Sequence, residues 1–178
     1  MSCIDGTFEN AEKVAFSLQN SEVSGIFFWQ PKNTPLGIVD FLYAQTGPLA
    51  DNKKVWSEPG KLFLDGFEYS ALAPGAPQTA RERLNWIRRQ NSGSNPFTPQ
   101  PYEHLIKVFR KMGHTRDARD VGIAKHEDFR LNGCCSNGRE WFWNWTLGKT
   151  IDHGYRPWKA LLPIVFVMLI GFGVFNEA

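Results

Sequence analysis

The stretch 157–178 reads PWKALLPIVFVMLIGFGVFNEA, and its residues 160–175 contain no charged side chain. As an α-helix, those 16 residues measure about 24 Å, somewhat less than the roughly 30 Å hydrocarbon core of a bilayer. Trp158 and Lys159 extend the span, because indole rings favour the headgroup layer and lysine side chains reach towards water. The stretch therefore predicts a C-terminal transmembrane helix over 157–178. A buried core helix at the end of a soluble domain is the alternative.

The segment just upstream, 139–152, is rich in tryptophan and reads REWFWNWTLGKTID. Indole rings concentrate at membrane interfaces, so this segment predicts a helix lying in the interface plane. The turn HGYRP then leads into the apolar stretch, and 139–156 forms one membrane-docking segment. The predicted membrane-interface residues are Trp141, Trp143, Trp145, Tyr155, Trp158 and Lys159. A tryptophan-rich core helix is the alternative.

The net charge of +2 is unevenly distributed. Residues 101–159 carry eleven Lys and Arg against seven Asp and Glu, whereas residues 1–100 carry nine against ten. Under the positive-inside rule, this excess predicts a single-pass protein of the inner (cytoplasmic) membrane with a cytoplasmic N-terminus. The N-terminal residues have no basic region followed by an apolar run, so no cleavable signal peptide is predicted. Three cysteines (Cys3, Cys134 and Cys135) suit a reducing compartment.

Residues 73–138 have helical patterns and are predicted to form a helical block. A first helix is expected over 79–90, with Thr79 as N-cap and Glu82 completing a capping box. A second helix is expected over 102–112, where apolar residues recur at i, i+3, i+4 and i+7. Gly113 ends it, and a third helix is expected over 115–130. The predicted inward residues of the three helices are Ala80, Leu84, Ile87, Leu105, Val108, Phe109, Met112, Ala118, Val121 and Ala124.

Residues 1–72 lack helical periodicity. Leu18, Val23 and Phe28 are spaced by five, which is the repeat expected where each side of a β-helix coil takes one pentad. Further strands are expected over 38–43 and 61–64, with a polar loop over 47–60 that holds Trp56 against the end of the stack. The prediction is a short β-helix-like region, and a small irregular β-sheet is the alternative.

The chain contains none of the common catalytic or nucleotide-binding motifs, and no two histidines have metal-ligand spacing. We therefore predict no cofactor and no metal, with a surface or capping role for His104 and His114. Asp117 and Asp120 are predicted to lie on a solvated helix face with local ion pairs. Arg81, Arg83, Arg88 and Arg89 share the first predicted helix, but a net charge near zero argues against nucleic-acid binding. Anionic lipid headgroups better explain the basic residues near the apolar stretch.

Several segments together resemble a known bacterial family. They are LFLDGFEYSAL (62–72), ARERLNWIRRQ (80–90), FTPQPYEHLIKVFRKMGHTRDARDVGIAK (97–125) and GYRPWKAL (154–161). The chain resembles, over roughly residues 15–175, the C-terminal part of pentapeptide-repeat-like membrane proteins, often labelled membrane-associated oxidoreductases. The resemblance implies a cytoplasmic β-helix held at the inner membrane. Members of this family usually have more N-terminal coils, so the resemblance also implies that this chain is a fragment or shortened form.

Taken together, the sequence predicts an α+β protein with four parts. These are a β-helix-like region (1–72), a helical block (73–138), an interfacial helix and turn (139–156) and a transmembrane helix (157–178). The predicted function is a non-catalytic, membrane-anchored scaffold or interaction protein. Its predicted partners are the lipid bilayer and another protein, including a second copy paired through the N-terminal β edge. A membrane-associated oxidoreductase is the alternative, although no cofactor motif can be assigned to any position.

Overall fold

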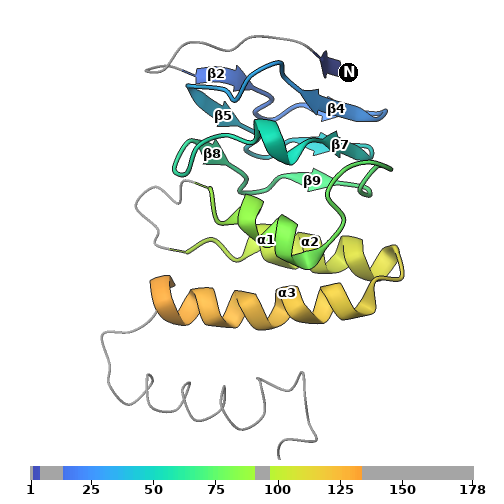
Figure 1. The fold of residues 1–178 in the computed structure, drawn as a ribbon, viewed down its shortest axis with the longest axis vertical. Helices are drawn as coiled ribbons and strands as arrows, with labels where there is room; N and C mark the ends of the chain where they lie inside the picture. Colours follow the sequence, from blue (N-terminus) through green and yellow to red (C-terminus); the bar gives the residue numbers. More distant parts are fainter. Residues whose placement is uncertain (1, 5–13, 91–96, 134–178) are drawn as a thin grey trace, which may run out of the picture. The chain divides into compact units, whose positions relative to one another are not determined.

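A computed structural model describes residues 2–4, 14–90 and 97–133 of the chain (Figure 1). The chain forms two units, 1–125 and 126–178, and the second is described only over 126–133. Within the described residues, no helix is both long enough and apolar enough to cross a bilayer. The predicted interfacial helix and the predicted transmembrane helix lie outside these residues.

The first part of the chain consists of short parallel strands, which are followed by helices. The predicted combination of strands and helices is therefore confirmed, and the fold is mixed α/β. The strands are β1 (Ser2–Ile4), β2 (Val14–Ser17), β3 (Glu22–Val23), β4 (Phe27–Gln30), β5 (Ile38–Asp40), β6 (Gln45–Thr46), β7 (Leu49–Asp51), β8 (Leu62–Phe63) and β9 (Glu68–Tyr69). They form three sheets in the orders β1-β4-β7, β2-β5-β8 and β3-β6-β9. Each circuit of the chain thus adds one strand to each sheet, which makes this part a coil of stacked circuits.

The circuits repeat every 23 residues over most of their length. In one sheet, Ser17 pairs with Asp40 and Asp40 with Phe63. The same step recurs at one corner of the coil, where Asn20, Tyr43 and Gly66 all have positive φ angles of 55°, 55° and 73°. Asparagine and glycine adopt this left-handed conformation readily, whereas tyrosine rarely does. The repeat is therefore imposed by strand pairing, and the side chains vary within it.

Aromatic side chains fill the interior of the coil. Phe27, Trp29, Phe41 and Phe67 are buried, and the ring centroids of Phe41 and Phe67 lie 5.0 Å apart. The five-residue spacing predicted that Leu18 and Phe28 both face the interior of the coil. This is correct for Leu18, which is buried, and wrong for Phe28, which is half-buried. Strand β4 alternates with a period of two, so the residues on either side of Phe28 point inward instead.

The predicted polar loop over 47–60 is wrong in its first half. Strand β7 occupies 49–51, and all three of its residues are buried. Leu49 pairs with Phe27 of the preceding circuit and with Leu72 of the following one. A short 3-10 helix, η1 (Lys53–Val55), follows. The prediction for Trp56 is correct, since its side chain is 4% exposed and packs against Trp86.

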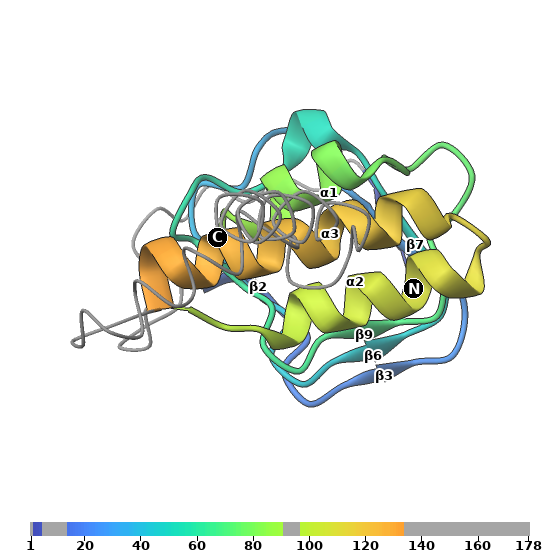
Figure 2. The ribbon, with the colours of Figure 1, turned by 90° about the horizontal axis from the view of Figure 1, so that it is seen from below.

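The three predicted helices are present as α1 (Ala80–Ile87), α2 (Gln100–Lys111) and α3 (Thr115–Asp128), followed by a π-helical turn, η2 (Phe129–Gly133). Figures 1 and 2 show α1 and α2 next to the β9 end of the coil, so the helices cover the last circuit. Lys125 forms an ion pair with Glu103 and thereby links α3 to α2. All the residues predicted to face inward are buried except Met112, which is half-buried and packs against the core.

Candidate functional site

A carboxylate lies inside the coil at a position that the preceding circuit fills with an aromatic ring. Asp51 in β7 pairs in register with Trp29 in β4, and its side chain is 1% exposed. A buried carboxylate without a partner would be strongly destabilising, since it loses its hydration. Asp51 therefore requires hydrogen-bond donors from elsewhere in the fold.

Helix α1 supplies the main partner, Arg83, whose side chain is fully buried. Its Nη1 and Nη2 atoms donate to the two oxygens of Asp51 at 2.9 and 2.6 Å. Its Nε donates to the carbonyl oxygen of Pro77 at 2.8 Å, and the indole Nε1 of Trp56 donates to Asp51 Oδ2 at 2.7 Å. This bidentate, charge-assisted pair joins the coil to the helices, and we call it the junction pair.

Aromatic rings enclose the junction pair. The Arg83 guanidinium carbon lies 5.3 Å from the ring centroid of Trp86 and 6.0 Å from that of Trp56, which are cation–π distances. Burial raises the pKa of the Tyr69 phenol far above its usual range; Arg83 opposes this shift and Asp51 adds to it. The phenol therefore stays protonated. Because these groups are closed to solvent, the arrangement serves to hold the fold together.

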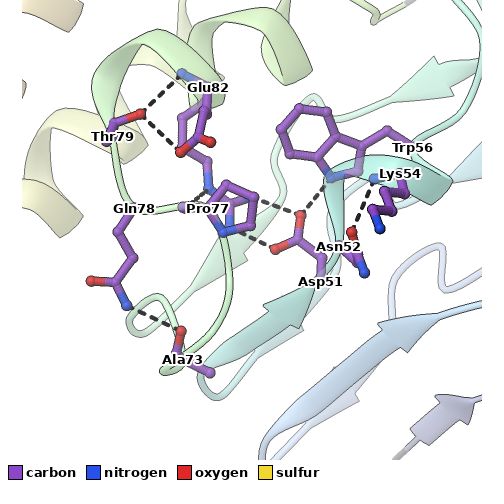
Figure 3. Close-up of polar contacts among 10 residues, drawn as sticks. Asp51, Asn52, Lys54, Trp56, Ala73, Pro77, Gln78, Thr79 and Glu82 are labelled. Atoms are coloured by element: carbon purple, nitrogen blue, oxygen red, sulfur yellow. Dashed lines mark hydrogen bonds and ion pairs between the residues drawn. The ribbon is translucent and has the colours of Figure 1, made fainter.

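The start of α1 is held by two sets of hydrogen bonds. Thr79 Oγ1 accepts from the Glu82 backbone N–H at 3.3 Å and donates to Glu82 Oε2 at 2.9 Å, which confirms the predicted capping box (Figure 3). Asp117 Oδ1 accepts from the Ala80 backbone N–H at 2.8 Å. The prediction that Asp117 belongs to a solvated face is therefore wrong: α3 packs close enough for its carboxylate to cap α1. Hydrogen bonds from Lys53 and Thr79 lower the pKa of Glu82.

His104 contacts the last strand of the coil. Its Nε2 lies 2.9 Å from both the backbone nitrogen and the backbone oxygen of Tyr69, and it bonds one or the other according to its tautomer. A surface or capping role was predicted for His104, whereas the imidazole is half-buried and bonds the backbone of strand β9. Burial lowers the pKa of His104, and the hydrogen bond with Tyr69 and the charge of Glu68 oppose that shift.

We expect the protein to become less stable as the pH falls below about 6.5, the usual pKa of histidine. The folded state holds His104 at a lowered pKa, so the unfolded state binds the proton first. The contribution of His104 is complete above that pH and is lost as the pH falls towards the lowered pKa. Urea unfolding at neutral and mildly acidic pH measures this loss. A His104→Gln variant should show a smaller dependence on pH over this window, and an equal dependence would contradict the assignment.

The residues predicted to contact the membrane, from Trp141 to Lys159, all lie outside the described part of the chain, as do Cys134 and Cys135. Within the described residues, no group of three His, Cys, Asp or Glu side chains is placed to hold a metal ion. Of the arginines considered for nucleic acid, Arg83 is committed to the junction pair. Arg89 donates to the Ser57 carbonyl oxygen and lies over the Trp56 ring.

Comparison with models of known protein families, with curated proteins and with solved structures found no match. The geometry alone therefore defines the class of this protein. It is a parallel β coil whose last circuit is covered by helices and joined to them by a buried ion pair.

Proposed function

We propose that this protein is a non-catalytic, membrane-anchored scaffold that presents the surface of its coil and helices to a protein partner. The anchor is the apolar stretch 160–175 with its flanking tryptophans, and the basic excess over 101–159 favours a cytoplasmic location for the rest. In this arrangement, the chain crosses the membrane once, and Trp141, Trp143 and Trp145 belong to its interfacial segment.

The junction pair is the observation that carries the scaffold role. A catalytic group must reach its substrate, whereas the side chains of Arg83 and Asp51 are 0% and 1% exposed and bond to each other, to Pro77 and to Trp56. His104 and Asp117 likewise bond to the backbone of other elements. His104 on α2 bonds to Tyr69 of β9, and Asp117 on α3 bonds to Ala80 of α1. The chain therefore uses these charged side chains to join the coil to the helices, as a presenting surface requires.

Strands β1, β2 and β3 offer a second route to a partner. In the part of the chain that the structure describes, each lies at the edge of its sheet and pairs on one side. Edge strands offer backbone donors and acceptors to another chain. This placement supports self-association through the first circuit as part of the scaffold role.

We expect the full-length protein to sediment with membranes and to remain there after an alkaline carbonate wash. Each arginine in the middle of a membrane helix costs about 2.5–3.5 kcal/mol, so a Val167→Arg/Leu169→Arg variant should move to the soluble or aggregated fraction. Val167→Ala/Leu169→Ala is the matched control and should stay in the membrane. Recovery of the unmodified protein in the soluble fraction would overturn the membrane anchor. A flavin or haem absorbance band in the purified protein would favour the oxidoreductase alternative.

A further inference from the structure

Two grooves flank the short helix η1, which follows the strand that carries Asp51. The first, of about 520 Å³, lies between η1 and α1 and is lined by residues that include Lys53, Arg81, Asn85 and Arg89. The second, of about 550 Å³, lies on residues 30–34 and η1. Its lining includes Lys32, Asn52 and Lys54. We call them together the η1 grooves.

Positive charge dominates the lining of the η1 grooves. Lys32, Lys54 and Arg81 are exposed and form no ion pair with another described residue. Lys53 bonds to Glu82 at 3.1 Å, and Glu82 is the acidic residue of the lining. Its other carboxylate oxygen accepts from Thr79, so this acid is already occupied by partners from the protein. The three unpaired cations therefore face solvent without local compensation.

The amide side chains of the lining add hydrogen-bond donors. Asn85 accepts from Arg89 through its Oδ1, and Asn52 accepts from the Lys54 backbone N–H through its Oδ1. An asparagine amide has both an acceptor oxygen and a donor nitrogen. Since internal bonds occupy both oxygens, the NH₂ groups of these two exposed asparagines have no bonded partner among the described residues. The η1 grooves thus add amide donors to their cations, and Gln30 and Asn33 in the second groove carry further amide groups.

We propose that the η1 grooves bind an acidic, extended segment of another protein. This rests on the scaffold role proposed above and names the chemistry of its partner. Carboxylates accept hydrogen bonds from ammonium, guanidinium and amide groups, which are the groups that this lining offers. An extended chain advances about 3.3 Å per residue with alternating side chains, so successive carboxylates can reach both sides of η1.

Two other polyanions fit the same surface less well. A bilayer presents a flat layer of headgroups, whereas these cations line two grooves. The lining also has few apolar side chains that could insert into a bilayer. Single-stranded nucleic acid binds largely through stacking on exposed aromatic rings. Trp56, the aromatic residue of the lining, is only 4% exposed and packs against Trp86. The lining therefore favours carboxylates on a peptide.

The test is binding of a fluorescein-labelled peptide of alternating Glu and Gly to the full-length protein in neutral detergent, followed by fluorescence anisotropy. We expect binding that weakens as salt is added, because these contacts are exposed charges. A Lys32→Gln/Lys54→Gln/Arg81→Gln variant should bind about tenfold more weakly or worse. The matched control Arg110→Gln/Arg116→Gln/Arg119→Gln removes the same charge from exposed positions on α2 and α3 and should bind as the unmodified protein does.

Equal loss in both variants would show that net charge alone attracts the peptide and would overturn the proposal. Binding of oligo(dT) without binding of the acidic peptide would also overturn it and would identify a nucleic-acid surface. Because the proposed anchor itself binds membranes, a lipid surface at the grooves would be identified only if the groove variant bound phosphatidylserine vesicles more weakly than the matched control did. The membrane sedimentation assay is independent of this result. A protein that sediments with membranes but does not bind the peptide loses the groove proposal and keeps the anchor.

Discussion

Replacing Arg83 with methionine is expected to lower the free energy of unfolding by about 3–5 kcal/mol, because it leaves Asp51 buried without its ionic partner. The loss also removes the donor to the Pro77 carbonyl oxygen and the cation from between Trp56 and Trp86. Urea unfolding of the full-length protein in detergent, followed by tryptophan fluorescence, measures the change. Trp56 and Trp86, two of the seven tryptophans of the chain, lie beside the junction pair and contribute to this signal.

The control for this change is Arg81→Met, two residues earlier on the same helix. Arg81 is exposed, so we expect a change within about 0.5 kcal/mol. A second test is the double variant Asp51→Leu/Arg83→Met, which removes both charges together. It should cost less than the sum of the two single changes, since neither charge is left buried alone. Additive losses would show that the two side chains are not coupled.

Replacing Gly47 with alanine is expected to destabilise the coil by about 3 kcal/mol, at the upper end of the usual cost of overpacking. A Cβ atom at this position would lie 2.8 Å from the carbonyl carbon of Gly25 and still closer to its oxygen. The obstructing atoms belong to the backbone of the preceding circuit, so they cannot move aside as a flexible side chain would. Gly47 N–H also donates to the Val23 carbonyl oxygen at 2.9 Å, which holds the two circuits together.

Gly25→Ala is the matched control, because Gly25 is the residue that Gly47 approaches. A Cβ atom on Gly25 would meet no described atom within 4 Å, and its φ angle lies outside the left-handed region. Alanine there restricts the unfolded chain, so we expect either no change or a gain of up to about 1 kcal/mol. If both substitutions destabilised the protein equally, the close stacking of these two circuits would be wrong.

Local signals were sufficient to predict the helices. Thr79 and Glu82 carry a capping box, and Leu105, Val108 and Phe109 have the spacing of one buried helix face. The strands were harder to predict, because pairing over 23 residues leaves only a weak pattern in the sequence. Aligning the chain with itself at this step would have placed Asp40 under Ser17 and Tyr69 under Thr46. Strand β7 would not have followed from the same step, because it pairs with β4 at a step of 22 residues.

A signal for Arg83 was also present. On α1, Ala80, Leu84 and Ile87 form the buried stripe, and Arg83 occupies the i+3 position of that stripe. A charged residue on a buried face requires a partner, but nothing in the sequence says which acid supplies it. Asp51 and Arg83 lie 32 positions apart, and the residues between them include other acids, among them Glu58, Asp65 and Glu68. The choice among them depends on the path of the last circuit, which places Asp51 against α1.

By itself, the amino-acid sequence determined the helices, their caps, their buried faces and the succession of strands followed by helices, because these depend on residues only a few positions apart. It also predicts the membrane segment, through composition alone. Tertiary structure decided which distant residues meet: Asp51 with Arg83, His104 with Tyr69, and Asp117 with Ala80. It also decided which cations line the two η1 grooves. These contacts join residues 32 to 37 positions apart within the named pairs, and only the packing of helices on the last circuit brings them together.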